Sequence, residues 1–324
     1  MKVLNLCIQD PAGAAYTLSH ALNKAGHEAI SIRANDNYIH YPTISTLRMY
    51  EQEAVKRIAE KADVVVFHQA VQPFLQAIGI DPKKLGRKII YFHGSECRSM
   101  GPQIVEQARE LLGDFQVLVS TPDLLKVVPD SKWMPVCRSF DKIQGTYAQS
   151  RRDEAALAAF GEPRSRVVIT HAPTNIEIKG STYFYRVITE VVKGAPWVEY
   201  QPIQNMPWDA CLRMMAGCSI LFDSCILGIY GLVAVEASIF RLPVICRIDP
   251  FVAEVMERES GLRQPFIQWP DEDSLRTQTF MLCDPAHGPE IRKQFGDLGY
   301  RYCKRMHDEK PVAERFTKIV GEMP

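Results

Sequence analysis

The sequence lacks the features that mark a membrane or exported protein. No apolar segment reaches the roughly 18–20 residues that a transmembrane helix needs. The chain opens directly on a strand-like apolar run, Val3–Ile8, without the charged and apolar regions of a secretory signal. We therefore expect a protein that is soluble and cytoplasmic.

The sequence also lacks a charge excess and a cysteine framework. Its 38 Lys and Arg residues balance 38 Asp and Glu residues, and the absence of a long basic run argues against a large electrostatic footprint on nucleic acid. The nine cysteines are scattered without a C-x-x-C pair, and some lie in apolar runs, such as Cys7 and Cys246. They are typical of small buried side chains in a reducing compartment, not of disulfides or a zinc site.

A chain of 324 residues is long enough for two domains, each with its own core. Short apolar runs alternate with helical patterns, which is typical of α/β folds with parallel sheets. The runs expected as strands are Val3–Ile8, Glu28–Ile32, Val64–Phe67, Lys88–Phe92, Gln116–Val119, Arg166–Ile169, Trp197–Tyr200 and Ile220–Phe222. Many stop at a polar residue, and in open α/β sheets the ligand crevice lies beyond the carboxyl ends of the strands.

One strand–loop–helix–strand unit, Ser219–Asp249, carries an unusual charge. Its helical segment is apolar on nearly every face except for Glu236, so we expect that helix to be buried. A buried carboxylate is costly unless a donor bonds to it. Two interpretations stay open: Glu236 favours the helix N-terminus electrostatically, or it accepts two hydroxyl protons from a vicinal diol such as a ribose. Asp223, which ends the preceding strand, could hydrogen-bond the glycine loop and orient it.

The same unit resembles the nucleotide-binding signature of GT-B glycosyltransferases, specifically the large retaining family 4. The residues that carry the resemblance are Gly228, Ile229, Tyr230, Gly231, Glu236, Ala237, Pro243 and Val244. The resemblance implies that backbone amides from Gly228 to Leu232 lie against the donor diphosphate, and that Glu236 holds the ribose. The family motif usually has another glutamate at the position of Gly228, and that glutamate commonly helps to hold the transferred sugar.

Lys179 stands just before a predicted helix N-terminus, where a cation is disfavoured by about 0.3–1 kcal/mol. The cost would be offset if the lysine and the helix end bound an anion together. Ser181 is expected to cap this helix. The segment resembles the family's donor-diphosphate segment, which implies donor contacts for Thr174, Asn175 and Lys179. A nearby arginine of the family is missing here, and three others could replace it: Arg98, Arg138 or Arg247.

His93, Gly94 and Ser95 follow an expected strand and resemble the His-Gly-Ser segment of many family 4 enzymes. The resemblance implies that His93 faces the transferred sugar, that Gly94 lets backbone come close, and that Ser95 adds a donor. Gly13, at the first strand-to-helix turn, would lie near the donor phosphate or the acceptor, with a plain tight turn as the equal alternative. His68, at another strand end, is interpreted as a hydrogen-bonded loop residue.

The polar stretch Ser139–Asp153 lacks apolar periodicity and is interpreted as an inter-domain linker, followed by a helix over Glu154–Phe160. We expect an acceptor-side domain over residues 1–145, a donor-binding domain over 146–305, and a helix over 306–324 that crosses back to the first domain. Both domains are expected to be Rossmann-like and to face a cleft, the GT-B architecture that the resemblance implies.

The resemblance implies transfer of a sugar from a UDP- or GDP-sugar to an acceptor hydroxyl, with retention and without a metal or other cofactor. The expected catalytic residues are His93, Lys179 and Glu236. The partners are the nucleotide sugar and an acceptor that is a glycan, a lipid, a small molecule or a nucleic acid. Three alternatives stay open: a sugar-nucleotide epimerase of the same fold, a non-catalytic nucleotide-sugar binder or partner subunit, and a glycosyltransferase acting on modified nucleic-acid bases.

Overall fold

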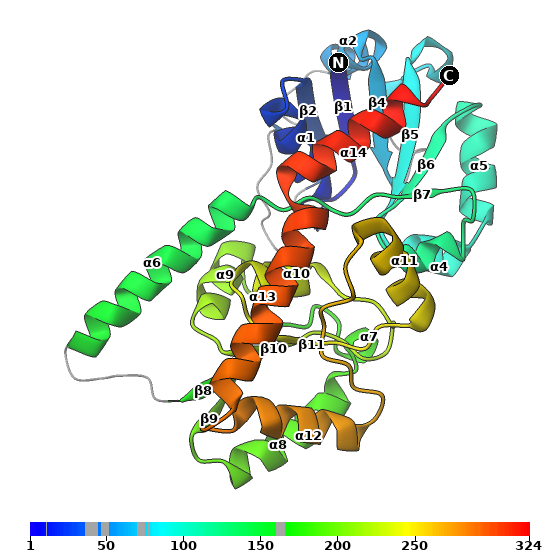
Figure 1. Ribbon diagram of the computed structural model, residues 1–324. Coiled ribbons are helices and arrows are strands. Elements are labelled where there is room, and N and C mark those ends of the chain that lie inside the picture. The colour runs from blue at the N-terminus through cyan, green and yellow to red at the C-terminus, as the bar shows by residue number, and fades with distance from the viewer. Residues whose placement is uncertain (11, 36–44, 47–51, 70–74, 77, 160–165) are drawn as a thin grey trace. The chain divides into compact units, whose positions relative to one another are not determined.

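The computed structural model describes the chain from Met1 to Pro324 apart from residues 11, 36–44, 47–51, 70–74, 77 and 160–165. The chain divides into two compact units, each built on its own parallel sheet (Figure 1). Unit 1 comprises Met1–Ser139 and His307–Pro324, and unit 2 comprises Phe140–Met306. The expected α/β fold with parallel sheets is therefore confirmed.

The described part of unit 1 has a seven-stranded parallel sheet in the order β3-β2-β1-β4-β5-β6-β7. Its strands are β1 (Lys2–Cys7), β2 (Glu28–Arg33), β3 (Ser45–Thr46), β4 (Val64–His68), β5 (Arg87–Phe92), β6 (Gln116–Val119) and β7 (Lys132–Trp133). Every residue of β4 is buried, as expected for a parallel strand that is covered on both faces.

The helices of unit 1 are α1 (Ala14–Lys24), α2 (Gln52–Lys61), α4 (Ser95–Met100), α5 (Gln103–Leu112) and α14 (Glu309–Gly321), with short 3-10 turns η2 (Pro82–Lys84) and η3 (Pro122–Leu125). Helix α14 brings the end of the chain back beside α1 (Figure 1). The Glu309 carboxylate bonds His20 Nδ1 at 2.6 Å and Lys24 Nζ at 2.5 Å, both on α1. Residues 307–324 belong to unit 1, and the apolar side of α14 is buried there through Val312 and Phe316.

Unit 2 has a parallel sheet in the order β11-β10-β8-β9 among its described residues. Its strands are β8 (Val167–His171), β9 (Val198–Pro202), β10 (Ile220–Phe222) and β11 (Val244–Ile245). Its helices are α6 (Phe140–Ala159), α7 (Ile176–Lys179), α8 (Ser181–Gly194), α9 (Trp208–Ala216), α10 (Leu232–Ile239), α11 (Pro250–Ser260), α12 (Glu272–Cys283) and α13 (Gly288–His307). The pairing of β8 with β10 brings together loops that are far apart in the sequence.

The predicted linker is wrong, because helix α6 runs from Phe140 to Ala159 and covers nearly all of Ser139–Asp153. Phe140 and Ile143 are fully buried, and Tyr147 stacks on Phe240. These apolar contacts stabilise a helix in a segment that is otherwise mostly polar. Unit 2 begins with α6 at Phe140, before the boundary expected after residue 145. The last residue of the expected helix Glu154–Phe160 lies outside the described residues.

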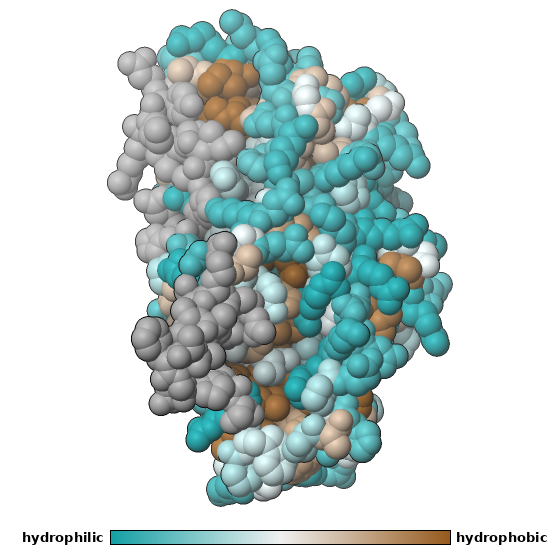
Figure 2. All heavy atoms as spheres, turned by 60° about the vertical axis from the view of Figure 1, so that its left-hand side comes forward, coloured by the Kyte–Doolittle hydropathy of each residue, from teal (hydrophilic) through white to brown (hydrophobic). Residues whose placement is uncertain are grey.

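All nine cysteines are free thiols, and all are buried except Cys211, which is partly exposed. On the face drawn in Figure 2, hydrophilic side chains dominate and hydrophobic ones form small separate patches. No helix in the described parts of the chain has the length and apolar character needed to cross a membrane.

Candidate functional site

In unit 2, Lys179, Asp223 and Gly231 form one cluster beyond the carboxyl ends of β8 and β10. The Lys179 ammonium donates to Asp223 Oδ1, and the Gly231 amide donates to Asp223 Oδ2 at 2.5 Å. The Asp223 side chain is fully buried, whereas that of Lys179 is 15% exposed. A buried carboxylate is tolerable here because a cation and an amide satisfy it. The expected bond between Asp223 and the glycine loop is confirmed.

The local fold places Lys179 directly before α8, as predicted. Helix α7 begins after Asn175, whose side chain accepts from the amides of Glu177 at 3.0 Å and Ile178 at 2.9 Å. Gly180 then adopts a left-handed conformation, φ 70°, and joins α7 to α8. Asn175 and its neighbour Thr174 are exposed. Because the side-chain oxygen of Asn175 accepts from two amides of α7, it stabilises the turn that holds Lys179.

Ser181 does not cap α8 through its side chain, contrary to the prediction. Its hydroxyl lies 2.7 Å from His171 Nε2, and His171 Nδ1 lies 2.9 Å from the carbonyl of Phe222. Because a carbonyl only accepts, Nδ1 carries the proton and Nε2 accepts from Ser181. Burial lowers the pKa of His171 to about 4, so this ring is neutral and ties β8, β10 and α8 together.

Gly228 has a structural reason to be glycine. Its φ is 68°, and a Cβ there would lie 3.0 Å from Asp249 Cβ. The Gly228 carbonyl also accepts from the Asp249 amide at 2.8 Å. Any side chain at this position, glutamate included, would be strained by the left-handed backbone and by a close contact with Asp249.

In the loop from Gly228 to Gly231 the side chains point into the protein, which leaves backbone groups to contact a ligand. Ile229 and Tyr230 are buried, and the Tyr230 hydroxyl lies 3.2 Å from that of Tyr302. Helix α10 starts at Leu232 after Gly231, whose own amide bonds Asp223 and which has no side chain to accept from the amides of the first turn. A helix start carries a positive partial charge from its amides.

Glu236 is buried, 3% exposed, and lies beyond the first turn of α10, which contains no acidic residue. The interpretation that it stabilises the helix N-terminus is therefore wrong. The indole of Trp208 on α9 donates to Glu236 Oε1 at 2.8 Å, and Lys142 Nζ lies 5.2 Å from the Trp208 ring centre. The sequence gives little sign of this role for Trp208, which stands directly after Pro207 at the start of a helix.

In unit 1, His93 is joined to His68 by a hydrogen bond of 2.9 Å between His93 Nε2 and His68 Nδ1. His68 Nε2 in turn lies 3.0 Å from Asn5 Oδ1. Burial lowers the pKa of His93 to about 3 and that of His68 well below its ordinary value, so both rings are neutral near neutral pH. His68 is hydrogen-bonded as predicted, but it ends β4 and does not lie in a loop. Asn5 was not predicted as a site residue, although it is the one polar side chain within the apolar run Val3–Ile8.

The residues after His93 form a tight turn into α4. Gly94 has φ 78°, and a Cβ there would lie 2.7 Å from Arg98 Nη1. Ser95 is exposed. Arg98 donates to the Asp123 carboxylate at 2.6 and 3.2 Å, so its charge already has a partner.

Among the three arginines considered for the diphosphate, Arg247 alone belongs to unit 2. Arg247 is exposed, and its Nη1 lies 3.5 Å from the carbonyl of Cys225. The Cys225 amide donates to the carbonyl of Lys179 at 3.2 Å. Arg247 is therefore attached to the loop that contacts Lys179.

Gly13 precedes α1 in unit 1 with φ 63°. The carboxylate of Asp10 accepts from the amides of Ala15 at 3.3 Å and Tyr16 at 3.1 Å. The protein's own carboxylate thus occupies amides at the start of α1, the groups that a phosphate would use.

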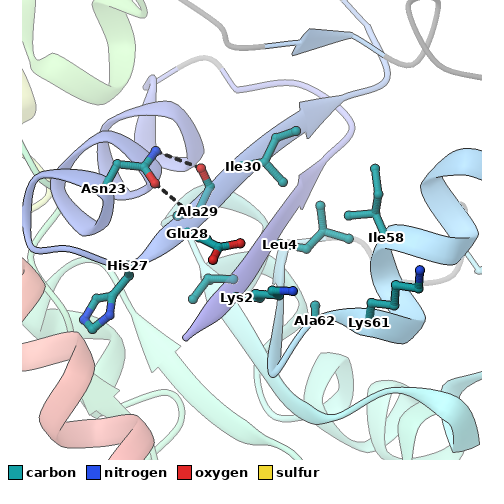
Figure 3. Close-up of a pocket in the computed structure, with 11 residues that line it drawn as sticks. Lys2, Leu4, Asn23, His27, Glu28, Ala29, Ile30, Ile58, Lys61 and Ala62 are labelled. Carbon is teal, nitrogen blue, oxygen red and sulfur yellow. Dashed lines mark hydrogen bonds between the residues drawn. The ribbon is translucent and has the colours of Figure 1, made fainter.

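A pocket of about 500 Å³ lies at the opposite, amino-terminal end of the unit 1 strands (Figure 3). Lys2, Glu28, Ile30 and Ile58 are among its lining side chains. Since ligand crevices of such sheets lie at the carboxyl ends, this pocket is separate from the residues predicted for the donor.

No protein-family model matches the chain, and no curated protein matches its sequence. Its fold, however, is similar to many solved structures. A glycosyltransferase from Rickettsia africae superposes with a TM-score of 0.61 at 10% identity, over 99% of this chain and 98% of that chain. A UDP-forming α,α-trehalose-phosphate synthase from Burkholderia vietnamiensis gives 0.65 at 11% identity, over 100% of both chains.

A UDP-GlcNAc 2-epimerase from Neisseria meningitidis, bound to UDP-GlcNAc, gives a TM-score of 0.56 at 12% identity over 100% of both chains. At identities this low the likeness shows the fold alone. The chain has the GT-B fold of these glycosyltransferases, and that fold hosts more than one chemistry.

Proposed function

We propose that this protein is a glycosyltransferase that binds a UDP- or GDP-sugar on unit 2 and transfers the sugar to an acceptor hydroxyl. The observation that carries the proposal is the cluster of Lys179, Asp223 and Gly231 at the start of α10. A cation next to a glycine loop and a helix N-terminus is a site suited to a diphosphate. UDP is the first nucleotide to test, because two of the similar structures are a UDP-forming synthase and an enzyme bound to UDP-GlcNAc.

Cleavage of the glycosidic bond leaves negative charge on the diphosphate, and stabilising that charge is the main task of such a site. The Lys179 ammonium has three N–H donors, so it can bond the phosphate while it still bonds Asp223, and Arg247 supplies the second positive charge. Glu236, held by Trp208, takes the ribose hydroxyls, while His93 contacts the transferred sugar. We expect retention of configuration and no requirement for a metal, so activity should persist in a chelator.

The first test is thermal stabilisation by UDP, GDP, ADP and their sugar conjugates. A ligand at a hundredfold its Kd should add about 2.7 kcal/mol to the free energy of unfolding. Lys179→Met should abolish the shift, and Arg247→Ala should reduce it. Lys193→Met is the matched control, because Lys193 is an exposed lysine in the last turn of α8. An equal shift in Lys179→Met and wild type would refute the donor site.

Products separate the remaining alternatives. A glycosyltransferase releases the nucleoside diphosphate and attaches the sugar to an acceptor, whereas an epimerase returns a changed sugar. A non-catalytic binder is stabilised by the nucleotide sugar but consumes none across a panel of glycan, lipid and small-molecule acceptors. Transfer to a nucleic-acid base would be accompanied by salt-sensitive binding of nucleic acid.

A further inference from the structure

Three polar side chains form a hydrogen-bonded chain across neighbouring strands of unit 1. Asn5 lies on β1, His68 ends β4, and His93 follows β5, and these three strands are adjacent in the sheet. Asn5 Oδ1 lies 3.0 Å from His68 Nε2, and His68 Nδ1 lies 2.9 Å from His93 Nε2. The far end of the chain is anchored on α1, where Asn5 Nδ2 donates to Ser19 Oγ at 2.9 Å.

This geometry fixes where each proton lies. With its amide nitrogen turned to Ser19, Asn5 presents a carbonyl oxygen to His68, so His68 Nε2 must carry the hydrogen. A neutral imidazole has one N–H, and His68 Nδ1 is therefore a lone pair that accepts from His93 Nε2. His93 Nδ1 is then itself a lone pair.

His93 Nδ1, the acceptor at the end of this series of hydrogen bonds, has no described partner, and the atom is buried. Buried polar atoms are nearly always paired, so such an atom calls for an explanation. The rings around it are tightly placed, since those of Tyr91 and His93 are centred 4.3 Å apart and those of His68 and His93 are stacked at 5.1 Å.

We propose that Asn5 and His68 are positioning residues that hold His93 as its Nε2–H tautomer, so that Nδ1 is kept as an acceptor for a hydroxyl of the sugar. The sugar half of this inference rests on the proposed function, whereas the tautomer half does not. On this view His93 orients the sugar and is not an acid. The orientation of the Asn5 amide sets both tautomers. If its NH2 group faced His68 instead, each of the two histidines would carry its proton on the other ring nitrogen.

Long-range nitrogen–proton NMR correlations of isotope-labelled histidine rings test the tautomer directly. Variants His68→Gln and His93→Gln assign the signals. Wild type should show His93 protonated on Nε2 only. Asn5→Asp, which keeps an acceptor facing His68, should retain that tautomer, whereas the isosteric Asn5→Leu should give a mixture. The inference is overturned if wild-type His93 carries its proton on Nδ1, or if folded Asn5→Leu keeps a single Nε2–H form.

Addition of ligand tests the sugar half. The nucleotide sugar should shift the His93 Nδ1 signal, and the nucleoside diphosphate alone should leave it in place. In kinetics Asn5→Leu should lower kcat/KM by roughly ten-fold, the worth of about one hydrogen bond, without changing affinity for the diphosphate. Thermal stabilisation by the nucleotide sugar with an unmoved Nδ1 would refute the sugar contact while the donor site stands. Absence of any stabilisation would refute the donor site and the sugar contact, with the tautomer decided by the spectra above.

Discussion

Gly180, between Lys179 and α8, is a position where a single added methyl group should strongly destabilise unit 2. Its φ of 70° is one that L side chains rarely adopt, and a Cβ there would lie 1.9 Å from Cys225 Sγ. Both atoms are enclosed, because Gly180 and Cys225 are buried. Gly180→Ala therefore combines backbone strain with a steric overlap.

The two contributions can be estimated separately. Placing alanine in the left-handed region costs roughly 1–2 kcal/mol. Forcing an extra methyl group into a filled site costs about 1–3 kcal/mol more. We expect Gly180→Ala to lose about 2–5 kcal/mol in the free energy of unfolding. Gly261→Ala is the matched control in unit 2, because Gly261 has φ 66° but nothing closer than 3.7 Å to its Cβ position, so only strain applies.

Urea titration followed by tryptophan fluorescence measures these losses, since three of the four tryptophans, Trp197, Trp208 and Trp269, lie in unit 2. The added cost of Gly180→Ala should shrink toward that of Gly261→Ala when Cys225→Ala removes the overlapping sulfur. Equal costs for the two glycine variants, or no relief from Cys225→Ala, would show that the turn adapts and that the overlap is not real.

Two further predictions concern buried hydrogen bonds. Trp208→Phe leaves Glu236 Oε1 without its indole donor, so it should lower the free energy of unfolding by about 1–3 kcal/mol and weaken binding of the nucleotide sugar. Trp269→Phe is the control, because the buried indole N–H of Trp269 has no described partner, and it should leave that binding unchanged. Calorimetric titration compares the two variants, and an equal loss of affinity would contradict the role of Glu236 in donor binding. Burial lowers the pKa of His171 from 6.5 to about 4 in the folded protein. Between pH 6.5 and about pH 4 the unfolded chain therefore binds a proton that the folded protein does not, so the wild-type free energy of unfolding should fall by up to about 3 kcal/mol as the pH drops through this range. His171→Asn should lose less over the same window in urea titrations, and an identical pH dependence would rule the ring out as a cause.

The sequence predicted the strands well because short apolar runs bounded by turn residues leave few alternatives. It failed at Ser139–Asp153, where polar composition concealed a helix. The signal was present, since Phe140, Ile143 and Tyr147 recur at helical spacing, Phe140 and Ile143 are buried, and Tyr147 stacks on Phe240. Three apolar positions in a long polar segment were too few to outweigh its composition.

Individual site residues were easier to find than their partners. Lys179 and Asp223 were each singled out, but their ion pair joins the segments that follow β8 and β10, which only the pairing of these two strands brings together. The bond from Trp208 to Glu236 joins two helices, and its partner could not be inferred from local pattern. Local patterns report which side chain is unusual, whereas sheet order and helix contacts decide which group satisfies it.

The return of residues 307–324 to unit 1 has a consequence for the order of synthesis. Arg138, near the exit from unit 1, donates its amide to the His307 carbonyl at 2.8 Å, so the departing and returning segments are joined. Unit 2 is one continuous stretch that a ribosome completes first, and a nascent chain can fold such a stretch as a whole. Unit 1 begins earlier but must wait for α14 to cover α1. Unit 1, whose first strands are translated earliest, can therefore complete its core only after all of unit 2 has been synthesised.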